Sequence, residues 1–519
     1  MPQYVMAVDA GTGSCRAVLF DRDGHQVSIA QQEWVHPSLP DVPGSQVFDT
    51  RRNWALISRC IREAMLAKSI SPSQVKAVSA SSMREGMVLY DAAGRETWAC
   101  PNVDSRAAAE AAWMIKEGVA EKIFFEGGDW VSITAPPRLL WIKKNRPDIF
   151  RGMAHLGMIS DWILYRLSGR HVTDPSIGSS SAMFNLKRRA WSPEVAELCG
   201  LRPEVFPEVV ESGNAIGEVT ERAASDTGLA AGTPVVTGGA DTQLGLLGIG
   251  VTEPGRVTVV GGSFWQTTVL MKSARIDRKI RLRTLCHVVP GQWMMEGIGF
   301  YCGLTMRWFR DAFCQSEKEE ARRHQSDAYS VMEGLARSVP PGSNGVLGVF
   351  SNVMNSKRWV HASPSFMQFD ITDPDRSGKK ECIRAIEESA AYVALGHLRI
   401  IQSITRQRPE EVMLTGGASK GRLWPQIVAD VLGVKVNVPV VKESTALGCA
   451  IAAGTGAGWY ADMQEAAGRL AKVESSIEPS ASNHAEYERL YANWLEVYER
   501  ALGMVEDGFV RPLWRAVGT

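Results

Sequence analysis

One arrangement occurs twice, about half the chain apart: a strand, a turn of small residues and a second strand. The two copies occupy 4–20 and 256–270, and their turns are Ala10 to Gly13 and Gly261-Gly262-Ser263. A third strand is expected at 26–33, after the first copy. A recurrence at this spacing predicts two lobes of related topology, although glycine-turn hairpins are common enough for coincidence to stay an alternative.

The length of the chain also argues for two domains. Its 519 residues exceed what one hydrophobic core serves, since single cores stop growing at roughly 250–300 residues. We expect domains at 1–246 and 247–519, with the junction between Leu244 and Val257. Hairpins that alternate with helices predict an α/β fold with mixed sheets in both.

The second half of the chain has a clear series of helix and strand patterns. In order these are an amphipathic helix at 386–404, a strand at 411–414, a turn at 415–420, a helix at 422–432 and a strand at 434–438. His397 falls on the apolar face of the first helix, so we interpret it as a core residue rather than a ligand. After Trp459 the chain is expected to be helical, with Trp494 and Tyr498 packed on the body.

Charge, cysteine usage and hydropathy limit the classes of function. Lysine plus arginine and aspartate plus glutamate each number 57, so no overall field attracts nucleic acid or an anionic membrane. Nine scattered cysteines without a Cys-x-x-Cys pair are typical of reduced thiols in a cytoplasm. The sequence shows no signal peptide and no apolar run long enough to span a bilayer, which predicts a cytoplasmic protein. A homodimer stays open.

The segment Asp9-Ala10-Gly11-Thr12-Gly13-Ser14 puts a carboxylate at the end of a buried strand, beside a glycine-rich turn. Glycines let backbone amides approach phosphate oxygens, and an aspartate can hold Mg²⁺ through water. The alternative is an ordinary hairpin turn in which Asp9 only caps. Two further small-residue turns, Gly261 to Ser263 and Thr415 to Lys420, also follow strands. Three such turns favour a nucleotide site, because phosphoryl transfer depends on positioned phosphate cradles.

The segment Thr237 to Gln243 ends an apolar strand in two glycines and delivers Asp241 to the expected lobe junction. A carboxylate there could take the proton of an attacking hydroxyl. By itself, an aspartate after two glycines is more often a helix N-cap, and the junction position is what favours catalysis.

Arg84-Glu85 follows a strand and places a donor fork beside an acceptor, which suits a polyhydroxylated or carbonyl-rich ligand. The alternative is a surface ion pair. Asp104 offers a further acceptor, with a helix N-cap as its alternative, and Gln243 lies two residues after Asp241. We expect Arg84, Glu85, Asp104 and Gln243 on the substrate side.

Six stretches together resemble the FGGY carbohydrate kinase family, in the correct order and over nearly the whole chain. They are DAGTGSCRA, SMRE, GGADTQLG, VGGSFW, LTGGASKGRLWPQIVADVLG and KESTALGCAIAAG. The resemblance implies two actin-like (ribonuclease H-like) lobes that close on ATP, Mg²⁺ and a small-molecule substrate in the cleft between them. The first lobe would carry the substrate and the catalytic base, and the second would bind adenosine.

The resemblance also implies roles for single residues. Asp9 would lie on the side of Mg²⁺ and the phosphates, Asp241 would be the base, and Arg84 and Glu85 would bind the substrate. The ATP loops would be formed by Thr12, Gly13, Ser14, Arg16, Gly261, Gly262, Ser263, Gly416, Gly417, Ala418 and Lys420.

Two departures from the family pattern argue against a common pentose or glycerol as substrate. Asn355 to Trp359 stands where sugar kinases usually carry a Gly-Glu-Arg-Thr-Pro-like segment, and Arg138 replaces a lysine. The aromatic residue that glycerol kinase-like enzymes have near Asn102 is also missing, so the family's substrate contacts there are not transferred to this chain. One branch of the family matches better, on PDVPGSQVFD, ISDWILYRLSG, GLTMRWFRDAFC and KRWVHASPSF. That resemblance implies phosphorylation of a linear dihydroxy-dione on its terminal hydroxyl.

Two other classes of protein stay open on the sequence. An actin-like ATP-switched binding protein would keep the nucleotide loops, and a kinase-like regulator would keep them with weak turnover. Asp241 and the Arg84-Glu85 pair favour an enzyme, because a nucleotide switch needs no acceptor site.

Overall fold

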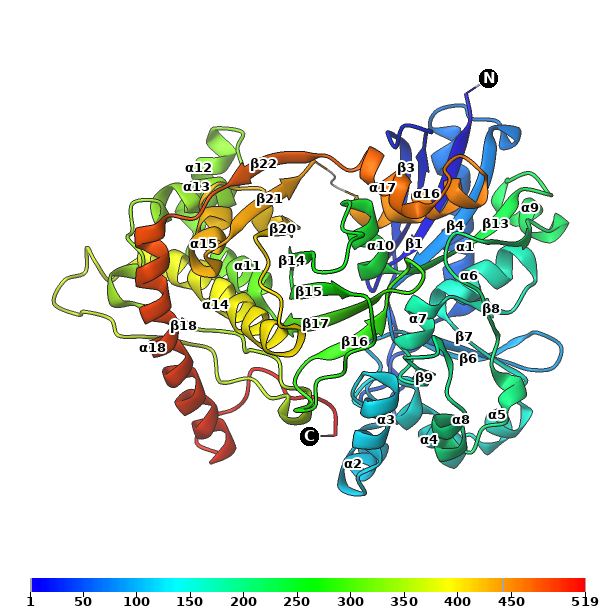
Figure 1. The fold of residues 1–519 in the computed structure, drawn as a ribbon, viewed down its shortest axis with the longest axis horizontal. Helices are drawn as coiled ribbons and strands as arrows, with labels where there is room; N and C mark the ends of the chain where they lie inside the picture. The colour runs from blue at the N-terminus through cyan, green and yellow to red at the C-terminus, as the bar shows by residue number, and fades with distance from the viewer. Residues whose placement is uncertain (1, 441–442, 519) are drawn as a thin grey trace.

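The chain folds into two lobes, each built on one mixed sheet, which lie side by side in Figure 1. The computed structural model describes residues 2–440 and 443–518. The first sheet has the order β12 (Ala215–Glu218), β13 (Pro234–Ala240), β4 (Val75–Ser82), β1 (Tyr4–Ala10), β2 (Ser14–Phe20), β3 (Gln26–Glu33). The second has the order β16 (Arg283–Cys286), β17 (Trp293–Gly299), β15 (Trp265–Met271), β14 (Val257–Gly261), β20 (Glu411–Thr415), β21 (Lys435–Pro439), β22 (Val473–Ile477).

The two sheets repeat one topology. In the first, β1 forms an antiparallel meander with β2 and β3, and β4 and β13 continue the sheet in parallel. In the second, β14 forms the meander with β15 and β17, and β20 and β21 continue it in parallel. Each sheet gains an antiparallel strand beyond the parallel pair, β12 or β22. The predicted repeat is therefore confirmed, and coincidence is not its explanation.

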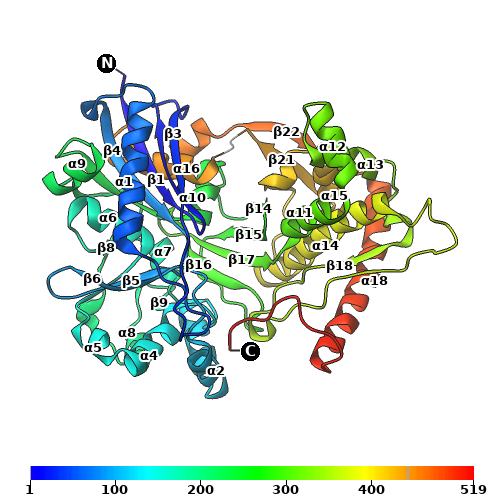
Figure 2. The ribbon, with the colours of Figure 1, turned by 180° about the vertical axis from the view of Figure 1, so that it is seen from behind.

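Alternation along β1 gives the first sheet two buried faces. Met6 and Val8 point into a core shared with α1 (Thr50–Leu66) and α6 (Ile159–Ser168). Val5 and Ala7 point into a second core, shared with α10 (Asp241–Gly248) and α16 (Ser444–Gly456). Because successive side chains of a strand point to opposite faces, helices must cover both. Figure 2 shows α1 in front of the sheet and α16 behind it.

Two helices from late in the chain belong to the first lobe. In Figure 1, α16 and α17 (Met463–Leu470), drawn in orange, lie against the blue strands of the first sheet. The chain returns to the second sheet at β22, a strand in the tail that we expected to be wholly helical. The division at 246 and 247 stays a prediction, and the second range supplies two helices to the first lobe.

The second sheet is covered on one face mainly by α14 (Lys379–Thr405), α11 (Cys302–Phe313) and α15 (Leu423–Leu432), with α18 (Ala481–Glu506) packed outside them. Trp494 and Tyr498 on α18 are buried, as predicted. The Nε2 atom of His397 accepts a hydrogen bond from the amide of Met354 at 2.8 Å, which confirms a core histidine. No helix in the described part of the chain is both long and apolar enough to cross a membrane.

A helical subdomain extends the first lobe around a small sheet and has its own core. It contains β5 (Met87–Tyr90), β6 (Glu96–Cys100), β7 (His155–Met158), α2 (Ala108–Lys116), α3 (Val119–Gly127), α4 (Ala135–Asn145), α5 (Pro147–Gly152), α7 (Pro175–Ser179) and α8 (Pro193–Cys199). The remaining elements are β8 (Val172–Thr173), β9 (Phe184–Asn185), β10 (Ala190–Trp191), β11 (Glu208–Val209), α9 (Glu221–Thr227), α12 (Gln315–Arg323), α13 (Ala328–Ala336), β18 (Leu347–Val349) and β19 (Ser365–Met367).

Candidate functional site

The turn between β1 and β2 is held rigid by two aromatic side chains. Trp34 Nε1 donates to the carbonyl oxygens of Gly11 and Thr12 at 3.1 and 3.2 Å. His36 Nε2 lies 2.8 Å from the same carbonyl of Thr12. Thr12 and Gly13 are nevertheless exposed, so the amides of this turn can meet a ligand. Nothing in our sequence analysis assigned Trp34 or His36 a role, because neither lies in the glycine-rich stretch.

Asp9 and Arg16 face each other across this hairpin. Asp9 Oδ2 accepts a hydrogen bond from Arg16 Nε at 2.8 Å, and Arg16 also pairs with Glu443, the residue before α16. Within the described residues the other oxygen of Asp9, Oδ1, is buried without a hydrogen-bond partner. A buried carboxylate oxygen left free beside exposed loop amides fits a water-mediated Mg²⁺ site better than a turn cap. Glu443 lies in the KESTALG stretch, to which we had given no role.

Asp241 is the first residue of α10 and follows β13 directly. Ala240 is the N-cap, so Asp241 is not the capping residue that the alternative required. Its half-buried side chain accepts a hydrogen bond from the amide of Thr242 at 2.6 Å and lies 4.0 Å from Arg84 Nε. Withdrawal from bulk water raises the pKa of Asp241 to about 6; Arg84 opposes this rise and Asp9 adds to it. A carboxylate with this pKa suits a general base near neutral pH.

Arg84 and Glu85 are buried and do not pair with each other, so a surface ion pair is not their explanation. Glu85 has a φ of 62°, a left-handed conformation that side chains other than glycine rarely adopt. Its amide donates to Ser180 Oγ at 3.3 Å, and its carbonyl accepts from the guanidinium of Arg138. Strained backbone persists only where the surroundings hold it, and it gathers at functional sites. Arg138, which stands where the family pattern has a lysine, is thus one of the groups that hold this backbone.

Asp104 and Gln243 are fully buried and bonded to protein groups. The carboxylate of Asp104 accepts from Arg106 Nε at 2.8 Å and from the amide of Gln46 at 2.7 Å. Gln243 Nε2 donates to the carbonyl of Cys286 at 3.2 Å. Among the described residues Gln243 Oε1 is buried without a hydrogen-bond partner, and the placement of both side chains on the substrate side stays a prediction. Asp104 is not a helix N-cap, since α2 begins after Ala107.

The second and third predicted loops line one cavity of about 530 Å³ in the second lobe. Gly261, Gly262, Ser263, Gly417, Ala418 and Lys420 all contribute to its wall. Gly416 packs against Gly261, where a Cβ atom would come within 2.8 Å of the Gly261 carbonyl carbon. The sequence analysis missed the side chains that form the rest of the wall, among them Arg307, Tyr329, Glu333, Glu387 and Trp424. They lie on helices, where a loop motif gives no signal.

The structure thus gathers the predicted residues into two groups. Asp9, Arg16, Arg84, Glu85 and Asp241 cluster at the junction of the lobes, and the loops at 261–263 and 416–420 line the cavity. Among described residues, no hydrogen bond or ion pair links the turn at 11–13 with these two loops. The two groups are suited to opposite ends of an extended site, such as one that binds a nucleoside triphosphate and its acceptor end to end.

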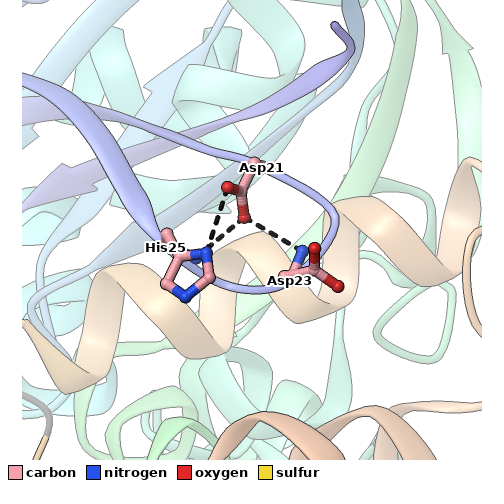
Figure 3. Close-up of side chains that lie close together, drawn as sticks. All are labelled: Asp21, Asp23 and His25. Carbon is pink, nitrogen blue, oxygen red and sulfur yellow. Dashed lines mark hydrogen bonds and ion pairs between the residues drawn. The ribbon is translucent and has the colours of Figure 1, made fainter.

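A third polar group, shown in Figure 3, lies in the exposed turn between β2 and β3. Asp21 Oδ1 accepts from the amides of Asp23 and His25, each at 2.9 Å, and Oδ2 lies 3.2 Å from His25 Nδ1. These contacts hold the turn itself, and we assign no metal to it.

Comparison with known proteins matches both halves of the chain to one family. Residues 4–248 match the N-terminal domain of the FGGY family of carbohydrate kinases, and residues 256–457 match its C-terminal domain. An autoinducer-2 kinase of Escherichia coli K12 is 46% identical over 519 residues, which cover 99% of this chain and 98% of the relative. An autoinducer-2 kinase of Yersinia enterocolitica is 45% identical over 518 residues, with the same coverage.

Solved structures share the fold at low sequence identity. A ligand-bound xylulose kinase from Lactobacillus acidophilus has a TM-score of 0.86 at 18% identity, over 98% of this chain and all of its own. A Plasmodium falciparum glycerol kinase with ADP has a TM-score of 0.85 at 16% identity, over 96% of this chain and 98% of its own. The predicted pair of actin-like lobes is therefore confirmed.

Proposed function

Because this chain belongs to the FGGY family of carbohydrate kinases, we propose that it acts as an autoinducer-2 kinase. The family and its relatives make it an ATP-dependent kinase. The proposed reaction transfers the γ-phosphate of ATP to the C5 hydroxyl of linear 4,5-dihydroxypentane-2,3-dione. Identity of 46% over almost the full length of proteins with that name supports the choice of acceptor. The two departures from the sugar-kinase pattern at Asn355 to Trp359 and at Arg138 agree with it.

The observation that carries the catalytic part is the position of Asp241. It lies 4.0 Å from Arg84, in a cluster with Asp9, at the junction of two lobes that each hold a glycine-rich turn. A nucleotide switch would need both turns but no carboxylate tuned to a pKa of about 6 beside them. This arrangement favours an enzyme over an ATP-switched binding protein.

On the nucleotide side, the cavity of the second lobe is proposed to hold adenosine, with Gly416, Gly417, Ala418 and Lys420 along one wall. Backbone amides at Thr12 and Gly13 would face the phosphates from the first lobe, and those at Gly262 and Ser263 from the second. Ser14 and Arg16 would support the first loop. Bound Mg²⁺ would neutralise charge on the phosphate oxygens, and the free oxygen of Asp9 is the group placed to hold it.

On the acceptor side, Arg84 would donate to the oxygens of the dione and Glu85 would accept from its hydroxyl groups. Asp241 would take the proton of the C5 hydroxyl as the hydroxyl oxygen bonds to the γ-phosphorus. The bond from that phosphorus to the oxygen bridging the β-phosphate would break, and ADP would leave with the bridging electron pair. Aligning one primary hydroxyl with the phosphate is the main requirement, because phosphoryl transfer depends on position and charge.

The test is competition between the dione, glycerol, xylulose and ribulose at equal concentration, measured as kcat/KM for each. The dione is expected to exceed the other three, because a wrong ligand leaves buried polar groups unpaired. If another acceptor exceeds the dione, the protein is a kinase for that acceptor. ADP release that no acceptor stimulates would favour the ATP-switched binding protein or the weak regulator.

We also propose a cytoplasmic location, since ATP is the phosphate donor. A homodimer stays a prediction that sedimentation equilibrium can test.

A further inference from the structure

The residues proposed to bind the acceptor are held by a buried ion network that crosses the lobe junction. Glu296 and Arg283 lie opposite each other on β17 and β16 of the second lobe. Arg84, Glu85 and Asp129 come from the first lobe. All five side chains are buried, and each first-lobe member bonds to a second-lobe member.

Arg283 makes the most contacts in this network. Its Nε donates to Glu296 Oε2 at 2.7 Å, and one terminal nitrogen donates to Glu85 Oε1 at 2.9 Å and to Asp129 Oδ2 at 3.1 Å. Glu296 also accepts from the two terminal nitrogens of Arg84 at 2.8 and 3.3 Å. The fork of Arg84 is thereby turned toward Glu296, with its Nε 4.0 Å from Asp241.

The backbone around this network is fixed to the first lobe as well. The amide of Thr284 donates to the carbonyl of Gly128 at 2.9 Å, and the amide of Cys286 donates to Ser179 Oγ at 3.0 Å. The edge of the second sheet is therefore anchored on the first lobe where the acceptor pair lies. Nothing comparable joins the phosphate loops within the described residues.

We propose that Arg283 and Glu296 are positioning residues for the acceptor, which hold Arg84 and Glu85 in place from the opposite lobe. The acceptor site is then preformed at the seam between the lobes, and the nucleotide cavity is the part that moves toward it. This inference rests on the proposed role of Arg84 and Glu85. It adds two residues that no sequence motif marked, since each stands alone in its strand.

The shape of arginine matters at position 283. The planar guanidinium of Arg283 reaches Glu296, Glu85 and Asp129 at once through two of its nitrogens, whereas an ammonium group is a point charge on a flexible stem. Lysine should therefore restore the charge but not the geometry. Removing one member of a buried, bonded charge network leaves its partners uncompensated, which displaces them.

The experiment compares Arg283→Met, Arg283→Lys and Glu296→Gln with wild-type protein, in steady-state kinetics with ATP and the dione. Arg283→Met and Glu296→Gln are expected to raise the KM for the dione roughly 10- to 100-fold, as expected for lost charged hydrogen bonds. The KM for ATP should stay within about twofold, because none of the five network residues lines the cavity. Arg283→Lys should fall between wild type and Arg283→Met.

Arg281→Met is the matched control. Arg281 lies two residues away and pairs with Asp277 at 2.9 Å, wholly within the second lobe. The Arg281→Met substitution should leave the KM for the dione and the KM for ATP unchanged, even if the melting temperature falls. Glu296→Gln keeps the shape of the side chain, and an unchanged KM for ATP reports a folded second lobe in every variant.

The outcomes separate this inference from the proposed function. If Arg84→Ala raises the KM for the dione but Arg283→Met and Glu296→Gln do not, the positioning role is wrong and the acceptor assignment stands. Equal rises in both KM values for Arg283→Met would also overturn it, since that pattern indicates general damage. If Arg84→Ala has no effect on the KM for the dione, the acceptor role of Arg84 and the positioning role of Arg283 and Glu296 are both wrong.

Discussion

The carboxylate of Asp241 is the residue whose chemistry is most directly testable. Asp241→Asn keeps the size of the side chain but removes the proton acceptor, so kcat should fall at least about 100-fold, the lower bound for such bases. The KM for ATP should change little, because the cavity lies in the other lobe. Retention of more than a tenth of the wild-type kcat would remove Asp241 from the mechanism.

The pKa of Asp241 also sets a pH dependence. Since this pKa is raised to about 6, the carboxylate is largely ionised at neutral pH and becomes protonated as the pH falls through 6. Only the ionised form accepts a proton, so kcat/KM for the dione, which reports ionisation before the acceptor binds, should decline on the acid side with a midpoint near pH 6. A kcat/KM profile that stays flat down to pH 5 would contradict this.

Glu387 predicts a second pH effect, on ATP binding. Burial raises its pKa to about 8, against the opposing charge of Arg384, so at neutral pH the side chain is a neutral acid in the wall of the cavity. As the pH rises through 8 it becomes a carboxylate that repels the nucleotide, and the KM for ATP should increase.

Glu387→Gln stays neutral at every pH and is the control for this effect. It should bind ATP as wild-type protein does at pH 7, and its KM for ATP should not rise at pH 9. If the KM for ATP rises equally at pH 9 in wild-type protein and in Glu387→Gln, ionisation of Glu387 is not the cause.

Among single residues, the sequence predicted those that motifs mark, and missed those that reach the site through the fold. Asp9 and Asp241 stand at strand ends beside glycines, so their surroundings were readable from their neighbours in sequence. Arg283 is the first residue of β16 and Glu296 stands inside the otherwise apolar β17, and only the pairing of these strands across from Arg84 gives the two residues a function. Glu387 was missed for a similar reason, because it is one of many polar residues on a long helix and no motif marks it.

At the scale of elements, the crossing of α10 and α16 controls where Asp241 lies. A Cβ atom on Gly448 would come within 1.9 Å of the carbonyl oxygen of Leu244, so only glycine allows the two helices to pack this closely. Thr445 Oγ1 also donates to the carbonyl of Asp241 at 3.2 Å, directly across the crossing.

Gly448→Ala should therefore push α10 away and displace Asp241 at its first turn. Overpacking of this kind costs about 1–3 kcal/mol of folding free energy. The fall in kcat should be larger than the loss of folded protein explains. Thermal unfolding and kinetics measured together test this. Gly468→Ala on α17, where a Cβ atom meets nothing within 4 Å, is the control and should alter neither.

The elements themselves were largely predictable, because periodicity and small-residue turns are local signals. The three strands of the first meander, the first two of the second, and the series from β20 to β21 were expected close to their observed bounds. The strand β17 was not expected, and α14 begins at Lys379 rather than at 386. The strand β22 (Val473–Ile477) was missed because its three central residues are polar and the strand is mostly exposed at the edge of the sheet, so it shows no apolar alternation. The packing of α16 on the first sheet could not be predicted, since no local pattern says which of two sheets a helix covers.

At the scale of the whole molecule, the separation of the phosphate loops predicts closure. ATP and the dione bound together should draw the nucleotide cavity toward the anchored seam, because an open cleft would let water compete for the γ-phosphate. Small-angle scattering should show a smaller radius of gyration for the protein with both a nonhydrolysable ATP analogue and the dione than with either ligand alone. No compaction with both present would contradict a closing motion.

The placement of α16 and α17 on the first sheet has a consequence for how the protein is made. The last strand of that sheet leaves the ribosome with residue 240, but the helices that cover one of its faces end at residue 470. At roughly 5–20 residues per second, the interval lasts on the order of 10–50 s. During it Val5, Ala7, Val18 and Phe20 lack the cover of α16 and α17, although all are buried in the finished protein. The first lobe to be translated is thus completed only after most of the second, so part of its sheet stays uncovered while the second lobe is made.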